Sequence, residues 1–493
     1  MHFSGIAMEM FLSGPPRRCC FLFAGPPFPL PPADTCLMNT RDVKKAWLEI
    51  WVLSWPLVLT MFLQFVVGLT DVYVAGLFRP EVQGAVGFGG QVLFFFSVFA
   101  NALGVGIVAI IARSVGARDQ GAMWHTARQG LLLAVLVTGP LSLLGIVLGS
   151  FDQLYWFLPE KVAAEGARLL PFYAAALLPQ GVLTVVAAIC RARGRMLVIL
   201  LCYGLTALLN LAGDFLLPFG YWLFPGVGAK GIAMATMASS LFGALLALLV
   251  LVRQGMAVSD WRLDRQLAAR LWKLGWPMGM LQLGWQFGSL ALYAILGFLP
   301  AQAVAATAAL TNGLRIEAIL YLPAYALNMI AAVLVGQALG SRNRQRAAQL
   351  GWQVAAIAAL VLSLLAVPVF IYSMELARAI SPDPLVQQLT HLYLRFNMIS
   401  QPFMAVGVCL GGALEGAGDT AGTMKVVLGA LWVIRIPLAA VLALATRLGA
   451  VGVWGAMVVS MILQGIFMAI RFRRGRWQDI DFAGGPGKAQ VNM

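Results

Sequence analysis

Apolar runs long enough to cross a lipid bilayer fill most of this 493-residue chain. About 20 mostly apolar residues span the hydrocarbon core, and a single run can satisfy its backbone there only as a helix. Charged residues make up only 11% of the chain, against about 25% in soluble proteins. We therefore predict an all-α, polytopic membrane protein with twelve transmembrane helices. They are expected at about 51–77, 83–112, 127–150, 167–190, 197–217, 231–252, 274–299, 304–336, 352–374, 392–414, 424–446 and 449–471.

The basic residues lie mainly in alternate connections between these runs. If the N-terminus is cytoplasmic, the inner connections and the tail hold 20 of the Lys and Arg residues after residue 46, and the outer connections hold 7. Basic loops remain on the cytoplasmic side of membrane proteins, so both termini are predicted to be cytoplasmic. The net charge of +14 is then explained by topology, and no nucleic-acid partner is expected.

The second half of the chain repeats the first. Because each half holds six runs, an even number, both halves enter the membrane from the same side, and such parallel repeats build transporters with a site between two lobes. The matches follow one order at a nearly constant offset: "LSWPLVL" around Pro56 with "LGWPMGM" around Pro277, "IIARSVGARD" (110–119) with "LVGQALGSRN" (334–343), "RARGR" (191–195) with "EGAGD" (415–419), and "GAKGIAMA" (228–235) with "GAVGVWGA" (449–456).

The repeat divides the chain into lobes and connections. The Pro-rich segment 1–37 is expected to be disordered or absent from the native protein, with translation starting at Met38. The domains that follow are an N-terminal lobe at 38–252, a cytoplasmic interlobe loop at 253–273, a C-terminal lobe at 274–474 and a cytoplasmic tail at 475–493.

Two acidic residues interrupt apolar runs of the first half. Asp71 lies in "QFVVGLTDVYVAGL", and Asp214 ends "TALLNLAGD", where Thr206 and Asn210 precede it at four-residue spacing and form one stripe on a helix. A carboxylate in hydrocarbon costs about 2.5–3.5 kcal/mol. We therefore expect both acids near mid-span, facing the bundle interior, where they share a proton, a Na⁺ ion or an amide partner. The residues do not choose between the two ions.

The repeat provides an internal control for these acids. At the offset that relates Pro56 to Pro277, Asp71 corresponds to Leu292 and Asp214 to Arg435. The fold therefore does not require acids at these positions, which favours a functional role. Glu317, an acid of the second half, is expected to pair with Arg315 or Arg435 as a structural set of charges.

The chain resembles the multidrug and toxic compound extrusion (MATE) family, and within it the bacterial DinF-type branch. The resemblance runs from Met38 to Arg474 and rests on the Trp-Pro pair that opens each half, on "AVGFGGQ", "ARSVGARD" and "NLAGD", and on "GLRIEAILYLP" followed by "LVGQALGSRN". It implies two six-helix bundles in a V shape, in the bacterial inner membrane. These would exchange amphipathic or cationic drugs outward for H⁺ or Na⁺ by alternating access.

The resemblance also implies roles for particular residues. The cation-coupling set would be Asp71, Asn210, Asp214, Thr236 and Thr206, of which Asp71, Asn210 and Asp214 would hold Na⁺ if that is the ion. Pro56 is expected to act in the conformational change, and Gln64, Met61 and Gln282 to line the cavity. The expected partners are small organic substrates and membrane lipids, with no cofactor, no other metal and a monomeric chain.

Two other functions fit parts of the sequence. A flippase for lipids or lipid-linked oligosaccharides, from the same wider superfamily, predicts a more cationic cavity, whereas only Arg315 and Arg435 lie clearly within helices. An intramembrane enzyme would need a nucleophile with a base, or metal ligands, and no H-E-x-x-H or G-x-S-x-G motif occurs. The chain is therefore predicted to be a transporter and not an enzyme.

Overall fold

The computed structural model describes residues 40–149, 151, 155–156, 158–220, 226–257, 261–299, 302–446 and 448–480. The extension 1–37, the predicted start at Met38 and the tail beyond Ile480 lie outside that part of the chain.

The described residues form twelve long helical rods and one short helix, which confirms the predicted all-α, twelve-helix class. Eleven rods are long and apolar enough to cross a membrane, and the twelfth, α8, is 33 residues long. The bounds are α2 Thr40–Gly76, α3 Pro80–Gly116, α4 Gln120–Leu148, α5 Glu160–Ala192, α6 Met196–Phe219, α7 Lys230–Arg253, α8 Arg265–Gly297, α9 Ala303–Gly340, α10 Arg344–Ile371, the short α11 Ser373–Ile380, α12 Pro384–Gly416, a broken rod α13 Thr420–Leu428 with η3 Gly429–Arg435, α14 Ile436–Ala440 and η4 Val441–Ala445, and α15 Ala450–Arg473; the 3₁₀ turn η5 Arg476–Asp479 follows.

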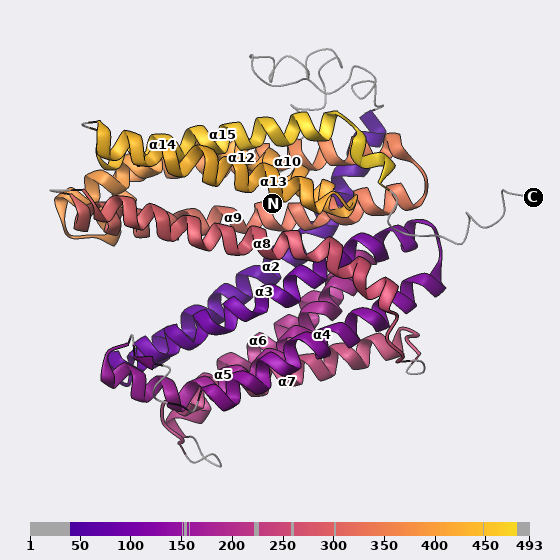
Figure 1. The fold of residues 1–493 in the computed structure, drawn as a ribbon, viewed down its shortest axis with the longest axis horizontal. Coiled ribbons are helices and arrows are strands. Elements are labelled where there is room, and N and C mark those ends of the chain that lie inside the picture. The colour runs from indigo at the N-terminus through magenta and orange to yellow at the C-terminus, as the bar shows by residue number, and fades with distance from the viewer. Residues whose placement is uncertain are drawn as a thin grey trace, which may run out of the picture.

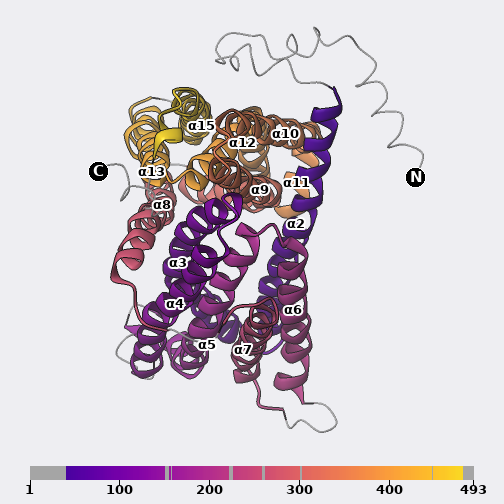
Figure 2. The same cartoon turned by 90° about the vertical axis from the view of Figure 1, so that its right-hand side faces the viewer.

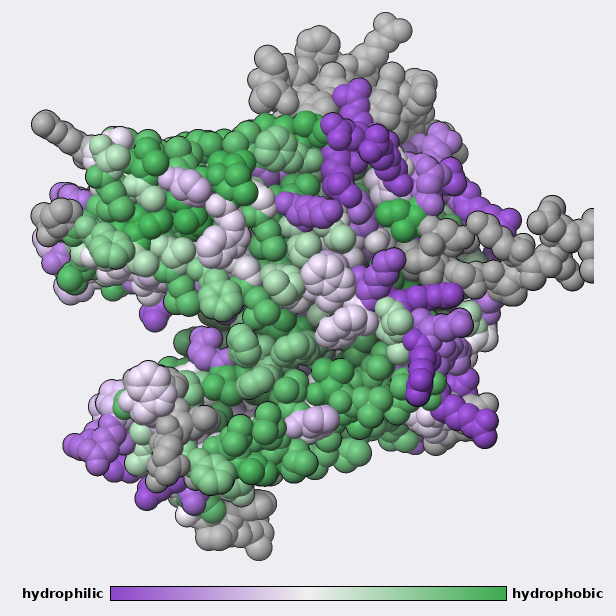
Figure 3. Space-filling model, viewed as in Figure 1, coloured by the Kyte–Doolittle hydropathy of each residue, from purple (hydrophilic) through white to green (hydrophobic). Residues whose placement is uncertain are grey.

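The rods group into two lobes that diverge from one end of the molecule (Figure 1). Helices α2 to α7 form the N-terminal lobe and helices α8 to α15 the C-terminal lobe, with α2 reaching up beside the C-terminal lobe (Figure 2). Hydrophilic residues gather at the joined end (Figure 3). Because Arg113, Arg191 and Arg342 lie there, it is called the basic end below. At the opposite end the space-filling surface is hollowed between the lobes (Figure 3).

The lobes meet backbone against backbone at the basic end. A Cβ atom on Gly116 of α3 would collide with the carbonyl group of Gln337 on α9, and one on Gly340 of α9 would collide with the carbonyl group of Arg113 on α3. In the sequence repeat, Gly340 is the equivalent of Gly116, and Gln337 is the equivalent of Arg113. The two contacts are therefore equivalent, as on either side of a two-fold axis.

The backbone of the connecting turns repeats as well. A positive φ is uncommon for residues other than glycine, yet Arg118 has φ 58° and its equivalent in the second half, Arg342, has φ 60°. Two glycine pairs behave in the same way at the offsets expected from the sequence matches. They are Gly194 (φ 74°) with Gly418 (φ 88°) and Gly228 (φ 67°) with Gly449 (φ 54°).

Side chains add polar links across the same joint. Gln337 Nε2 donates to the carbonyl oxygen of Ala192 at 2.8 Å, and Arg113 Nη2 donates to the carbonyl oxygen of Ala417 at 3.0 Å. Arg191 Nη1 lies 3.0 Å from the sulfur of Met329. Each link joins a helix end of one lobe to the other lobe, so the basic end is closed by contacts that must break if the lobes are to part there.

The connection between the lobes is shorter than predicted. Helix α7 ends at Arg253 and α8 begins at Arg265, so the segment 265–273, expected to be loop, is the first part of a helix. Asp264 caps α8 through its Oδ1 atom, which accepts from the backbone of Gln266 and Leu267 at 3.0 and 3.1 Å. Its Oδ2 atom lies 3.1 Å from His125 Nε2, and the His125 hydrogen bond, helped by the backbone N–H groups, lowers the pKa of the Asp264 carboxyl.

We predict that the tight joint depends on Gly275 of α8. A Cβ atom there would lie 2.6 Å from the carbonyl oxygen of Ala102, whereas one on Gly279, a turn further along, would come no nearer than 3.5 Å to another heavy atom. Alanine favours a helix interior by about 0.5–1 kcal/mol over glycine, but overpacking costs about 1–3 kcal/mol. Gly275→Ala should therefore lower the thermal unfolding midpoint of the detergent-purified protein, and Gly279→Ala should leave it unchanged or raise it. Equal midpoints for the two variants would contradict the proposed close approach.

Candidate functional site

The structure brings the two intramembrane acids of the N-terminal lobe together. Asp71 on α2 and Asp214 on the neighbouring α6 lie within hydrogen-bonding reach of each other's carboxyl group. Asp214 is fully buried, and Asp71 Oδ1 is buried as well. Two ionised carboxylates cannot hydrogen-bond, because neither has a donor. Contact between the two carboxyl groups is therefore favourable only when a proton or a cation lies between their oxygens.

The acids do not lie at mid-helix, which corrects the sequence-based expectation. Asp71 comes five residues before the end of α2 at Gly76, and Asp214 comes five residues before the end of α6 at Phe219. Both of these helix ends lie away from the basic end (Figure 1). Helix α2 begins at Thr40, toward the basic end and well before the predicted run 51–77. Helix α6, Met196–Phe219, nearly matches the predicted run 197–217, in which Asp214 already lies near the end.

Buried oxygen atoms of the pair and of its neighbours have no hydrogen-bond partner among the described residues. They include both carboxyl oxygens of Asp214, Asp71 Oδ1, Asn210 Oδ1 and the hydroxyl of Tyr173. A buried polar group without a partner costs about 1–3 kcal/mol, and more if it is charged. Within the described residues no group of three or more His, Cys, Asp or Glu side chains could hold a metal ion. The oxygen-only set suits a proton or a hard cation.

Tyr173 was not predicted from the sequence. It lies on α5, and its hydroxyl is close enough to Asp71 and Asp214 to interact with both electrostatically. The ring is buried because Gly89 of α3 leaves room for it: a Cβ atom on Gly89 would lie 2.5 Å from the ring. An aromatic residue in an apolar helix gives no sequence signal of such a role, and only the contact with Gly89 reveals it.

The threonines of the predicted set differ in position. Thr236 on α7 accepts a hydrogen bond from Asn210 Nδ2 at 3.5 Å, which places it beside the acids, and its own hydroxyl donates to the carbonyl oxygen of Ile232. Thr206 lies two turns before Asp214, donates to the carbonyl oxygen of Cys202 at 2.8 Å and faces Gly243 of α7. The structure therefore brings Asp71 and Asp214 together and joins Asn210, one turn before Asp214, to Thr236, with Thr206 set apart.

The residues predicted for movement and for the cavity lie along α2 and α8. Pro56 is buried within α2, Met61 packs on the core at the lobe joint, and Gln64 is exposed. Gln282 on α8 is half-buried, and its side-chain carbonyl oxygen has no hydrogen-bond donor. Along α2, Pro56, Met61 and Gln64 lie in this order between the joint and Asp71, and no contact with the acids is found for them or for Gln282 on α8.

The C-terminal lobe holds the buried charges Glu317 and Arg435, and these are satisfied by protein groups. Glu317 accepts from Tyr393 at 2.6 Å and from Gln401 at 2.7 Å. Arg435 donates to Ser460 Oγ at 2.7 Å and lies 5.1 Å from the ring centre of Trp285. Glu317 and Arg435 interact electrostatically, as expected, but within the described part of the chain no ion pair joins Glu317 to Arg435 or to Arg315. These two buried charges therefore have partners from the protein, in contrast to the oxygens of Asp71 and Asp214.

Comparison with known proteins places this arrangement among transporters. The family model MatE matches residues 56–216 and 277–441. A probable multidrug resistance protein NorM of Thermotoga maritima is 23% identical over 89% of this chain and 94% of its own length, and one of Geobacillus kaustophilus is 26% identical over 89% and 97%. The crystal structure of the Vibrio cholerae MATE transporter VcmN in its bent form matches with a TM-score of 0.81 at 19% identity, covering 88% of this chain and 98% of that chain. The last likeness shows the shared fold.

We predict that Gly89 positions Tyr173 at the acids. Gly89→Ala should push the ring out of place and weaken cation binding by about 1–3 kcal/mol, the usual cost of overpacking. The measurement is the thermal stabilisation of the detergent-purified protein by added Na⁺ and by acid. Gly90→Ala is the matched control, because a Cβ atom there has nothing within 4 Å. An unchanged response in Gly89→Ala, or an equal loss in Gly90→Ala, would contradict the role of Tyr173.

Proposed function

Because the chain belongs to the MATE family, we propose that this multi-pass membrane protein is a secondary-active antiporter that exports amphipathic or cationic small molecules in exchange for H⁺ or Na⁺. The observation that carries the proposal is the pair Asp71 and Asp214, whose buried oxygens Asp71 Oδ1, Asp214 Oδ1 and Asp214 Oδ2 have no hydrogen-bond donor among the described residues. Such a pair must gain a cation to be stable, and it lies in one lobe only. The DinF-type branch, the monomeric state and the inner-membrane location stay predictions.

The shape of the molecule supports an outward-open state. The lobes are closed at the basic end and hollowed at the other (Figure 3), and basic loops mark the cytoplasmic side. The cleft would therefore open outward. The acids lie near the outer ends of α2 and α6, where protons or Na⁺ from outside can reach them. Their arrival is the step that a coupled exporter needs in this state.

Helix α2 links the acids to the lobe joint. Its outer part packs on α6, and it also contacts α9 of the other lobe. Ile50 and Leu57, near its basic end, belong to the core that the two lobes share. Pro56 lies between these residues and leaves a backbone carbonyl without its helical partner. When a cation binds Asp71, α2 would bend near Pro56, weaken substrate binding in the cleft and change its contact with α9.

The proposed coupling predicts a loss of ion-driven export in Asp71→Asn and Asp214→Asn. The side-chain amide of either asparagine donates a hydrogen bond to the remaining carboxylate, so the pair no longer requires a bound cation. Efflux of a cationic dye from proteoliposomes, driven by separately imposed pH and Na⁺ gradients, should fall by about tenfold or more, a factor that corresponds to about 1.4 kcal/mol. The gradient that drives wild-type efflux identifies the ion.

Glu317→Gln is the control for this experiment. Glu317 is a buried acid whose oxygens already accept from Tyr393 and Gln401, so its variant should keep the response to both gradients, even if less protein folds. Full gradient-driven efflux in Asp71→Asn would remove the basis of the proposal. Wild-type protein that moves dye without either gradient would indicate a passive carrier, and movement of lipid alone would favour the flippase.

A further inference from the structure

Two opposite charges lie across the joint at the basic end. Arg191 comes from the last turn of α5, in the N-terminal lobe, and Glu415 from the last turn of α12, in the C-terminal lobe. Glu415 is only 7% exposed, and Arg191 is half-buried. The two groups act on each other electrostatically, without a direct ion pair among the described residues. Arg191 also lies near Tyr203 of its own lobe, but a phenol is uncharged near neutral pH.

Helix α9 holds both groups in place from the C-terminal lobe. Its neighbouring residues Asn328 and Met329 contact one charge each. Asn328 lies within hydrogen-bonding reach of the Glu415 carboxyl group, and the Met329 sulfur lies 3.0 Å from Arg191 Nη1. Asn328 Nδ2 also donates to the carbonyl oxygen of Val408 on α12 at 2.8 Å, which fixes its side chain. A thioether is a weak acceptor, so the guanidinium group gains more from the negative charge of Glu415 than from Met329.

The sequence repeat places the two charges at equivalent positions. Arg191 begins "RARGR", and Glu415 begins "EGAGD", the segment that matches it in the second half. Residues close to a two-fold axis lie near their own equivalents, so the same charged residue at both positions would repel its counterpart across the joint. In this chain the sign of the charge differs between the two halves, so the equivalent residues attract each other.

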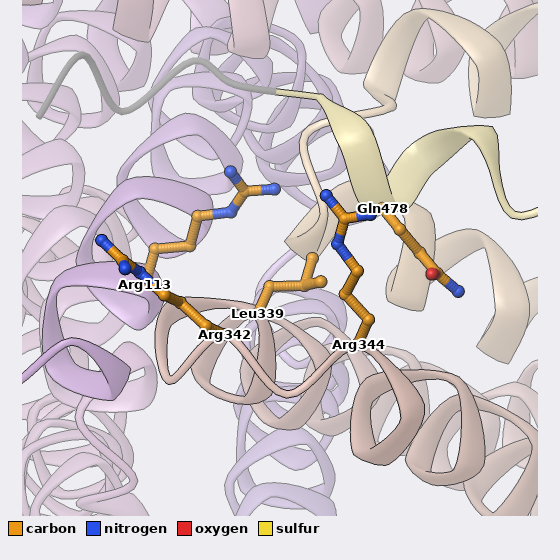
Figure 4. Close-up of a pocket in the computed structure, with 5 residues that line it drawn as sticks. All are labelled: Arg113, Leu339, Arg342, Arg344 and Gln478. Atoms are coloured by element: carbon orange, nitrogen blue, oxygen red, sulfur yellow. The ribbon is translucent and has the colours of Figure 1, made fainter. Parts of the chain in front are cut away.

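Two other arginines of the basic end have acidic partners within the C-terminal half of the chain. Arg471 on α15 donates to both carboxyl oxygens of Asp419 at 2.8 Å. Arg344, which lines a cavity of about 370 Å³ near the end of α3 (Figure 4), pairs with Asp479 at 2.8 Å. Neither of these pairs joins the N-terminal lobe to the C-terminal lobe, so neither has to break when the lobes part.

We propose that the attraction between Arg191 and Glu415 stabilises the closed state of the basic end. Parting of the lobes there carries the guanidinium group away and leaves the acid beside Asn328 without an opposite charge. Salt screens partly buried charges much less than exposed ones, so the attraction persists at physiological ionic strength.

The meaning of this pair for transport rests on the proposed antiport function. An exporter of that kind alternates between an outward-open state, in which the basic end is closed, and an inward-open state, in which it is open. Each return to the inward-open state separates Arg191 from Glu415. The two residues therefore set the population of the outward-open state, although neither belongs to the acid pair that takes up the cation.

Amide hydrogen exchange tests the pair on the full chain, purified in detergent. Exchange at the ends of α5 and α12 measures opening of the basic end, because protected amides exchange when the structure opens locally. Arg191→Gln and Glu415→Gln should each raise the exchange rate there about tenfold. The double variant should stay well below the roughly hundredfold rise expected of independent sites, since either single change already removes the attraction.

Arg195 and Asp419 provide the matched control, because they are the next equivalent pair of opposite charges in the same two segments. Arg195 is exposed, and Asp419 bonds Arg471 in its own lobe. The double variant of Arg195→Gln and Asp419→Asn should therefore show the product of the two single effects. A further variant, Arg191→Lys, retains the positive charge and should retain most of the protection.

Coupling between Arg191 and Glu415, with none between Arg195 and Asp419, would support the proposal. Independent effects in the first pair, equal coupling in both pairs, or as large a loss of protection in Arg191→Lys as in Arg191→Gln would overturn it. A rise in exchange spread evenly through both lobes would also overturn it, because it would indicate a general loss of stability. Hydrogen exchange requires no transport, so coupling without gradient-driven efflux would contradict the antiport function alone.

Discussion

Contact of backbone on backbone between α3 and α9 determines the shape of the molecule. Gly116 and Gly340 let the backbones of α3 and α9 approach so closely that a Cβ atom at either position would collide with the other helix. The internal two-fold axis relates the two contacts. Because the apolar surfaces of the lobes gain little from each other in lipid, close packing and polar links supply much of the attraction between transmembrane helices. These features are concentrated at one end, which leaves the other end free to open.

The acids are informative when they are compared with the buried charges of the C-terminal lobe. Glu317 and Arg435 in the C-terminal lobe have donors or acceptors from the protein, and the repeat places Arg435 at the position of Asp214. One fold therefore carries partnered charges at Glu317 and Arg435 and, within the described residues, carboxyl oxygens without donors at Asp71 and Asp214. In the proposed function, a site that exchanges cations must stay incomplete in the protein alone, and the pair Asp71 and Asp214 meets that condition.

The sequence allowed prediction of those features that would carry a large free-energy cost if they faced hydrocarbon. Twelve apolar runs and the meeting of Asp71 with Asp214 follow from the need to satisfy polar groups inside a bilayer, and the repeat was visible as matched segments at a nearly constant offset. The start of α8 was missed because its first turns are polar and lie beyond the apolar run. Tyr173 was missed because its role depends on space left by Gly89 on another helix. Thr206 lies on the same helix stripe as Asp214, but its hydroxyl bonds the backbone of its own helix and does not join the acids.

In the proposed function, the acids and the lobe joint act on one equilibrium from opposite ends of the molecule. Asp71 and Asp214 favour a bound cation at the open end, while the close approach of α3 and α9 at Gly116 and Gly340 favours the closed state of the basic end. Linkage makes the coupling between binding and conformation equal in both directions. If cation binding favours opening of the basic end, opening of that end must strengthen cation binding by the same factor.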